Sequence, residues 1–335
     1  MMKQFIKIFL LLLLPVFASG QTKYEIDNLR HELAIAKDDT SRVLILSDLS
    51  WMCLYLDYVS YEKYCREGLA LAQKINFSKG EIRIQNQICT GLQIQSEVPK
   101  SFEILFKELQ ITEEKRYLFE KAMTLNNIGN GYYFLSDFFK ALTFYRRANQ
   151  AIEGTQNKPE VIELKNLICL NIGQSYNEMN QLDSAFYYLQ ESYKATLNSE
   201  FWHPVSLYLF SDCLFKRGEH KKALEYIHQS LELTDKSGDR FTNADACTYI
   251  ARFFKELSQP DSVIYYAKKG LANSKAADFK IGIVKTSKLL AELYLPKDAK
   301  VANAYLQLAM SANDEIYGAK KVQDLQKAIS DEQER

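Results

Sequence analysis

The sequence predicts an all-α protein built from stacked helical hairpins, for three reasons. The chain of 335 residues holds only 6 prolines and 13 glycines, too few for the many turns of a β-sandwich or barrel. Its hydrophobic fraction of 47% is that of a folded chain. Small residues also return about every forty positions. A chain of this length is near the limit of a single hydrophobic core, and stacked repeat units bury their apolar faces against one another.

The first element, residues 1–20, has the layout of a secretory signal peptide. Two lysines precede an apolar run over residues 8–17, and small residues follow it just before Gln21. An uncleaved membrane anchor is the alternative, but the run is shorter than the roughly 20 residues that a spanning helix needs. No later stretch reaches that length, so we expect an exported chain with no membrane span after the leader.

A leading helix is predicted over residues 21–39, and a repeat array over residues 40–312. Seven small residues mark the first helix of each unit and return at a nearly constant interval. They are Ser50, Cys89, Gly129, Gly173, Ser211, Ala251 and Ala291. A second small residue usually follows about twelve positions later, so that two antiparallel helices can cross closely while larger side chains fill the wedge beside them.

Two units show this pattern most clearly. Their structural repeat residues are Gly129, Tyr132, Ala141 and Tyr145 in one unit and Gly173, Tyr176 and Ala185 in the next. These residues resemble the L-G-x2-Y…A-x3-F pattern of the tetratricopeptide repeat. The resemblance covers about residues 40–312 and implies a right-handed superhelix, an α-solenoid, of about seven hairpins with flanking helices. The period exceeds that of the tetratricopeptide family, so HEAT and armadillo arrays, which have longer repeats, are the rival interpretation; we attribute the extra length to inter-repeat loops and helix ends.

The segments at the two ends of the array, residues 36–42 and 311–317, resemble exported tetratricopeptide regions of bacterial sensor proteins. This resemblance implies the periplasmic sensor part of a histidine-kinase-like signal-transduction protein, whose membrane span and kinase would follow Arg335. A stand-alone periplasmic scaffold for envelope protein assembly is the alternative. An enzyme is the minor hypothesis, because no nucleophile elbow, phosphate loop or zinc-protease motif occurs.

In such superhelices the first helix of each hairpin lines a concave groove, where a protein or peptide can bind. The candidate groove residues are aromatic, amide or charged. They are Trp51, Tyr55, Asn86, Thr90, Asn126, Asn130, Tyr133, Gln174, Asn177, Tyr208, Asp212, Arg252 and Lys255. Aromatic side chains commonly anchor partners, and amides can pair with an extended backbone. Taken singly, each aromatic is also compatible with an ordinary half-buried position.

Residues 313–335 form a charged C-terminal helix with apolar residues on one side. We expect residues 313–320 to cap the array and the remainder to be a free tail that can pair with a second copy as a homodimer.

The remaining composition excludes other sites. The 42 basic and 42 acidic residues balance, which argues against nucleic-acid binding, and no cofactor motif is present. Four histidines without a nearby cysteine pair give no metal site. Most of the six cysteines are expected to be buried thiols, with Cys53 and Cys65 as the best candidate for a disulfide.

Overall fold

The computed structural model describes residues 21–156 and 158–333, and every regular element within these ranges is an α-helix. A leading helix, α2 (Gln21–Ile35), precedes seven hairpins, and α17 (Ala319–Gln333) follows them. The hairpins are α3 (Asp39–Cys53) with α4 (Tyr58–Lys74), α5 (Ser78–Ile94) with α6 (Val98–Glu114), α7 (Leu118–Phe134) with α8 (Phe138–Ala151), α9 (Pro159–Glu178) with α10 (Leu182–Thr196), α11 (Trp202–Lys216) with α12 (His220–Ser237), α13 (Arg240–Glu256) with α14 (Pro260–Ala276), and α15 (Lys280–Tyr294) with α16 (Ala299–Tyr317). The predicted all-α class is confirmed, and the predicted leader lies outside the described residues.

A turn that recurs at a constant interval sets the period of the array. Asn76, Ser96, Arg116 and Ser136 each have a φ between 56° and 64°, the left-handed conformation that ends a helix. The four helices α4 to α7 each contain 17 residues, and the same short turn follows each of them. The extra length over a tetratricopeptide repeat therefore lies in the helices, and the sequence interpretation that placed part of it in inter-repeat loops is wrong for these units.

Aspartate side chains cap the N-termini of five helices. Asp38, Asp57, Asp137, Asp239 and Asp298 each accept a hydrogen bond from a backbone N–H in the first turn of the following helix. Such a cap satisfies one of the N–H groups that the first turn leaves unpaired.

The two helices of a hairpin cross where a glycine faces a large side chain. A Cβ atom added to Gly129 in α7 would lie 2.5 Å from Cε1 of Tyr145 in α8. In the next hairpin, a Cβ atom on Gly173 would lie 2.8 Å from Cγ of Leu189. Ala141 is fully buried beside the first crossing. These contacts follow the register of small and large residues in the sequence.

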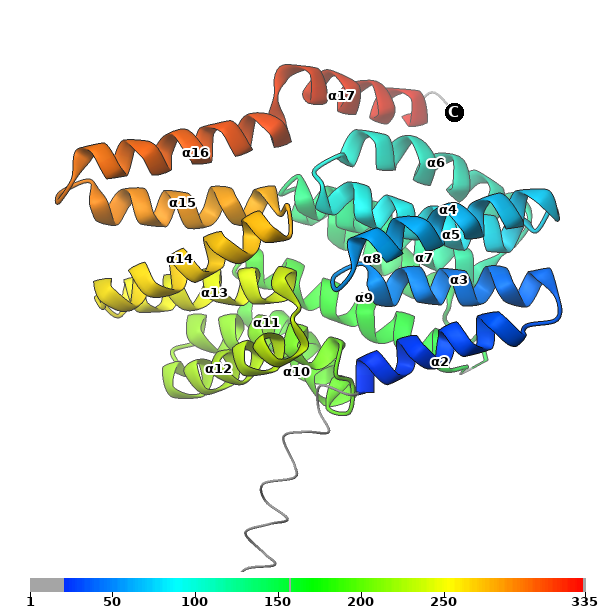
Figure 1. Cartoon of the computed structure of the whole chain (residues 1–335), viewed down its shortest axis with the longest axis horizontal. Helices are drawn as coiled ribbons and strands as arrows, with labels where there is room; N and C mark the ends of the chain where they lie inside the picture. The colour runs from blue at the N-terminus through cyan, green and yellow to red at the C-terminus, as the bar shows by residue number, and fades with distance from the viewer. Residues whose placement is uncertain (1–20, 157, 334–335) are drawn as a thin grey trace, which may run out of the picture.

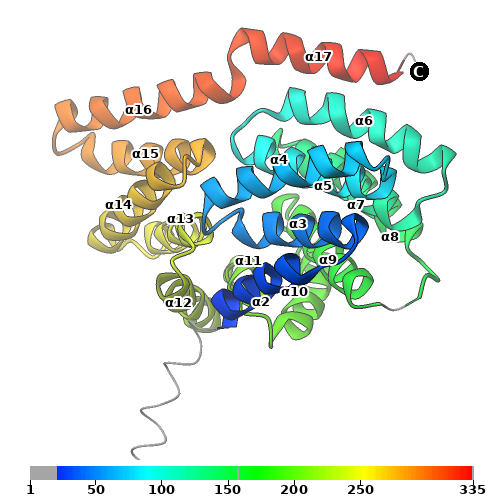
Figure 2. The same cartoon turned by 45° about the vertical axis from the view of Figure 1, so that its right-hand side comes forward.

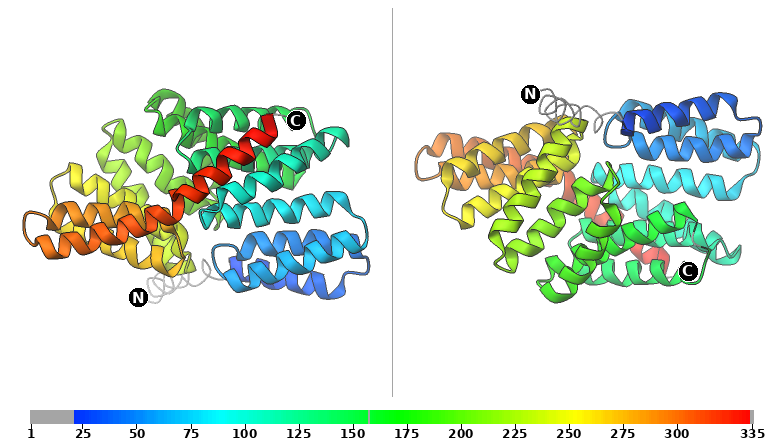
Figure 3. Two further views of the ribbon diagram at one scale, coloured as in Figure 1. Left: turned by 90° about the horizontal axis from the view of Figure 1, so that it is seen from above. Right: turned by 90° about the horizontal axis from the view of Figure 1, so that it is seen from below.

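The seven hairpins wind through about one turn, so that distant segments meet (Figure 1). From above, α17 crosses the top of the ring from the last hairpin toward the earlier ones (Figure 3), and it packs on α6. Figure 2 shows α17 running alongside α6 from a second direction. The last hairpin is therefore joined to the second by a strap, which we define as residues 313–333.

The strap corrects the prediction for the C-terminal residues. α16 continues to Tyr317, and the chain bends at Gly318 before α17 begins. Ala328 is buried against the array, with Leu325 and Ile329 packed beside it. These residues are therefore not a free tail, and pairing with a second copy stays a prediction.

The six cysteines are all free thiols, and the candidate bridge between Cys53 and Cys65 is not formed. Burial raises the pKa of both thiols to about 11. Within the described residues, no helix combines the length and the apolar character needed to span a bilayer.

Candidate functional site: a cavity inside the ring

The concave side of the superhelix encloses a cavity of about 450 Å³. The first helix of every hairpin contributes to its wall, and the end of α16 completes it. Lining residues include Thr90 and Gln93 of α5, Asn130 and Tyr133 of α7, Asn171, Gln174 and Glu178 of α9, Tyr208 of α11, Asp245, Tyr249 and Arg252 of α13, Lys285 and Lys288 of α15, and Tyr317 of α16. A volume of this size is typical of sites for small ligands.

One end of the cavity is crossed by a cluster that we call the aromatic bridge, formed by Trp51, Tyr55, Phe201, Trp202 and Phe241. The rings of Trp51 and Trp202 lie 5.5 Å apart, and those of Tyr55 and Phe241 lie 5.1 Å apart, measured between centroids. These pairs join the first hairpin to α11 and α13, across the ring. The bridge therefore interrupts the open groove that the sequence predicts.

The strap covers the cavity near the ends of α5 and α7. The hydroxyl of Tyr317 donates to the carbonyl of Phe134 at 3.2 Å, and Nζ of Lys321 donates to the carbonyl of Ser96 at 3.1 Å. Lys321 also forms an ion pair with Glu97, at 2.9 Å. Partial burial alone would raise the pKa of Glu97, but its bonds to Lys321 and Lys100 lower that pKa below its usual value.

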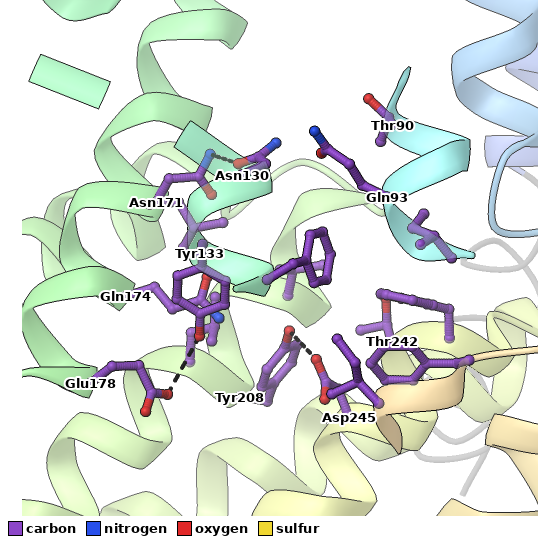
Figure 4. A pocket seen from close by; sticks show the side chains of 18 of the residues that line it. Thr90, Gln93, Asn130, Tyr133, Asn171, Gln174, Glu178, Tyr208, Thr242 and Asp245 are labelled. Atoms are coloured by element: carbon purple, nitrogen blue, oxygen red, sulfur yellow. Dashed lines mark hydrogen bonds between the residues drawn. The ribbon is translucent and has the colours of Figure 1, made fainter. Parts of the chain in front are cut away.

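Two carboxylates and three tyrosines form a polar wall inside the cavity (Figure 4). Oε1 of Glu178 accepts hydrogen bonds from the hydroxyls of Tyr133 at 3.4 Å and Tyr249 at 3.3 Å. Oδ2 of Asp245 accepts one from the hydroxyl of Tyr208 at 3.3 Å. Burial raises the pKa of each of the three tyrosines well above its usual value, so that these hydroxyls stay protonated and can donate.

Eight of the predicted groove residues line this cavity. They are Trp51, Tyr55, Thr90, Asn130, Tyr133, Gln174, Tyr208 and Arg252. Asn126 lines a smaller adjoining pocket of about 130 Å³, to which Trp51 and Trp202 also contribute. The aromatic candidates Trp51 and Tyr55 contact other rings of the same chain, so only part of each ring faces the cavity.

The remaining four candidates lie elsewhere. Asn86 is fully buried, and its Nδ2 donates to Glu108 of α6 at 2.9 Å. Asn177 donates to Asp212 at 2.6 Å, and both are buried between α9 and α11. Lys255 pairs with Glu292, and both of these side chains are exposed.

The amides were predicted to serve a ligand, but several join neighbouring repeats instead. Nδ2 of Asn127 donates to Oδ1 of Asn86 at 2.9 Å, and Nδ2 of Asn171 donates to Oδ1 of Asn126 at 2.9 Å. These bonds link α5 to α7 and α7 to α9. These amides thus hold neighbouring repeats together, because buried amides must find partners.

Sequence reasoning missed Glu178, Asp245 and Tyr249 in the polar wall. A signal was present, since Asp245, Tyr249 and Arg252 recur at spacings of four and three along α13 and so share one face of the helix. Glu178 likewise follows Gln174 by four residues. The aromatic bridge had no local signal, because its partners lie far apart along the chain.

Solved structures with similar folds agree with this architecture. A Rap protein complexed with competence and sporulation factor matches with a TM-score of 0.64 at 14% identity, over 88% of this chain and 87% of that one. The fold is a tetratricopeptide-type helical repeat.

Two further structures support the same fold. The Rap conjugation gene regulator of the plasmid pLS20, in complex with the Phr* peptide, has a TM-score of 0.59 at 17% identity, over 89% of this chain and 85% of that one. The apo form of the quorum sensor NprR from B. thuringiensis has a TM-score of 0.55 at 12% identity, over 87% and 81% of the two chains. No protein-family model matches the sequence, and no curated protein matches it.

Proposed function

We propose that this protein is a non-catalytic receptor that encloses a short peptide segment in the cavity of its ring. The cavity carries the proposal, since it has the volume of a small-ligand site and is lined by both rings and hydrogen-bonding groups. A folded partner fits this face poorly, because a stable protein interface buries about 800 Å² per partner and the aromatic bridge spans the groove. The regulator of plasmid pLS20, which has the same fold, was solved with a peptide.

We further propose that the protein is exported and acts as the sensor part of a signal-transduction protein in the cell envelope. The leader-like residues 1–20 support export. A strap that contacts both the cavity and the outer helix α6 supports sensing, because a ligand that alters one contact can alter the other. Fractionation of the native cells tests this point: a membrane-bound species much larger than this chain supports the sensor, whereas a soluble periplasmic species supports the scaffold.

Peptide binding is tested by native mass spectrometry of the purified protein mixed with a pool of random hexapeptides. Gln174 projects into the cavity (Figure 4), so Gln174→Trp puts a bulky ring into the space that the peptide would occupy. Tyr187 lies on the outer face of α10 and is 61% exposed, which makes Tyr187→Trp a matched control. We expect peptide adducts with the parent and the control but not with the filled variant. Equal adducts with all three proteins, or none with any, would refute the proposal.

A further inference from the structure

One of the two carboxylates of the polar wall, that of Asp245, is incompletely paired. The tyrosine hydroxyls satisfy Oε1 of Glu178 and Oδ2 of Asp245. Oδ1 of Asp245 is shielded from solvent and has no hydrogen-bond partner among the described residues. A buried carboxylate oxygen without a donor is unfavourable, and burial accordingly raises the pKa of Asp245. The cavity wall thus holds an acceptor for which no described residue of the chain supplies a donor.

Cationic side chains lie nearby but do not fill this gap. Arg252, Lys285 and Lys288 line the same cavity. Within the described ranges, none of the three donates a hydrogen bond to Glu178 or Asp245. Arg252 instead lies over the ring of Tyr249, 5.4 Å from its centroid. These cations balance the charge of the wall from a distance, and Oδ1 of Asp245 stays without a donor among the described residues.

The chemistry of the wall suits an organic cation better than a metal ion. The described residues contain no group of three or more side chains placed to hold a metal, whereas hard cations require six or more oxygen ligands. A guanidinium or ammonium group brings only donors and is also attracted to aromatic faces. Tyr133, Tyr208 and Tyr249 line the cavity and donate to the two carboxylates, so the wall offers both kinds of contact.

We infer that the bound segment carries a cationic group, a guanidinium or an ammonium, that docks at the polar wall beside the carboxylates of Glu178 and Asp245. This inference rests on the proposed function, because it assumes that a peptide enters the cavity. The cation can belong to an arginine or lysine side chain or to the amino terminus of the peptide. Lys285 and Lys288, both exposed in the cavity, would face carbonyl or carboxylate groups of the same segment.

The test compares pools of hexapeptides that differ in a single charge. One pool is capped at both ends and carries one arginine, a second carries neutral citrulline in its place, and a third carries citrulline with a free amino terminus. None contains tyrosine or tryptophan. The only two tryptophans of the chain, Trp51 and Trp202, lie at the cavity, so their fluorescence reports binding.

We expect the arginine pool to bind about tenfold more tightly than the capped citrulline pool, the effect of one charge-assisted hydrogen bond in a buried site. If the peptide's amino terminus is the cation, the third pool should bind about tenfold more tightly than the capped citrulline pool instead. Equal affinity for all three pools would overturn the inference and leave peptide binding intact. Binding of no pool at all would overturn both.

Variants that neutralise a carboxylate of the polar wall test whether it causes the preference for a cationic peptide. Glu178→Gln and Asp245→Asn keep an acceptor for the tyrosine hydroxyls but remove the charge. We expect each to lose about tenfold in affinity for the preferred charged pool and to bind the capped citrulline pool as before. Glu191 on the outer helix α10 forms an ion pair with Lys194, so Glu191→Gln is the matched control. An undiminished preference for charge in both wall variants would overturn the assignment.

Discussion

Replacement of Gly129 tests the crossing of α7 and α8. The added Cβ atom of Gly129→Ala would lie 2.5 Å from Cε1 and 2.6 Å from Cδ1 of Tyr145. The tyrosine cannot easily retreat, because it is only 1% exposed and its hydroxyl donates to Oδ1 of Asn130 at 2.8 Å. The ring or the helix must therefore move.

Whether Gly129→Ala stabilises or destabilises the protein shows whether the added Cβ atom has room at the crossing. In an unhindered helix, alanine is favoured over glycine by about 1 kcal/mol. Overpacking of a tight core costs about 1–3 kcal/mol. We therefore expect Gly129→Ala to cancel the helical gain or to destabilise the protein by up to about 2 kcal/mol, and Gly129→Leu to destabilise it by about 3 kcal/mol or more.

Urea denaturation followed by far-UV circular dichroism measures these changes. Tyr145→Ala removes the ring atoms that the added Cβ atom would meet. In the double variant, Gly129→Ala should regain about 1 kcal/mol relative to its effect in the parent, since residues in contact are coupled. A full helical gain in the single variant would show that the Cβ atom has room and that the assigned register is wrong.

Three further predictions concern a buried acid, the strap and the thiols. Burial raises the pKa of Glu108 well above its usual value. The protonated carboxyl therefore contributes its full stabilisation below the ordinary glutamate pKa of about 4.3, and this contribution is lost as the pH rises through the pKa of the folded state. The melting temperature of the parent should therefore fall relative to that of Glu108→Gln as the pH rises from that value, and parallel pH profiles would contradict the assignment. Ala328→Arg should release the buried face of α17 and speed amide exchange in α6, whereas Gln326→Arg, at an exposed position, should not. Cys53 and Cys65 should react with a thiol reagent only after unfolding, because both are buried with a raised pKa; rapid reaction in the native protein would show that the first hairpin is open.

The fold could largely be predicted because its determinants are local. Small residues at positions such as Gly129 and Gly173 fix where two adjacent helices cross, and their spacing is visible in the sequence. The period of the repeat was visible too, but its division between helices and turns was not. That division depends on residues such as Ser96 and Arg116 adopting a left-handed conformation, which non-glycine residues rarely do.

The site was only partly predictable because it depends on the global winding of the superhelix. The face of each inner helix could be assigned, so that Tyr133, Gln174 and Tyr208 were found. The contact of Trp51 with Trp202 and the docking of α17 on α6 arise only after about one full turn of the ring. Small rotations at each repeat accumulate, and no single spacing in the sequence encodes their sum. The position of Asn86 could not be predicted for a related reason, since it meets its partners on other helices.

Site-specific photo-crosslinking tests the central claim, that a peptide binds inside the ring, most directly. A benzoylphenylalanine placed at Gln174 faces the cavity, and one placed at Tyr187 faces outward. On irradiation with the random hexapeptide pool, we predict that the protein substituted at Gln174 forms covalent peptide adducts and that the protein substituted at Tyr187 does not. Adducts at Tyr187 alone, or equal adducts at both positions, would contradict the account.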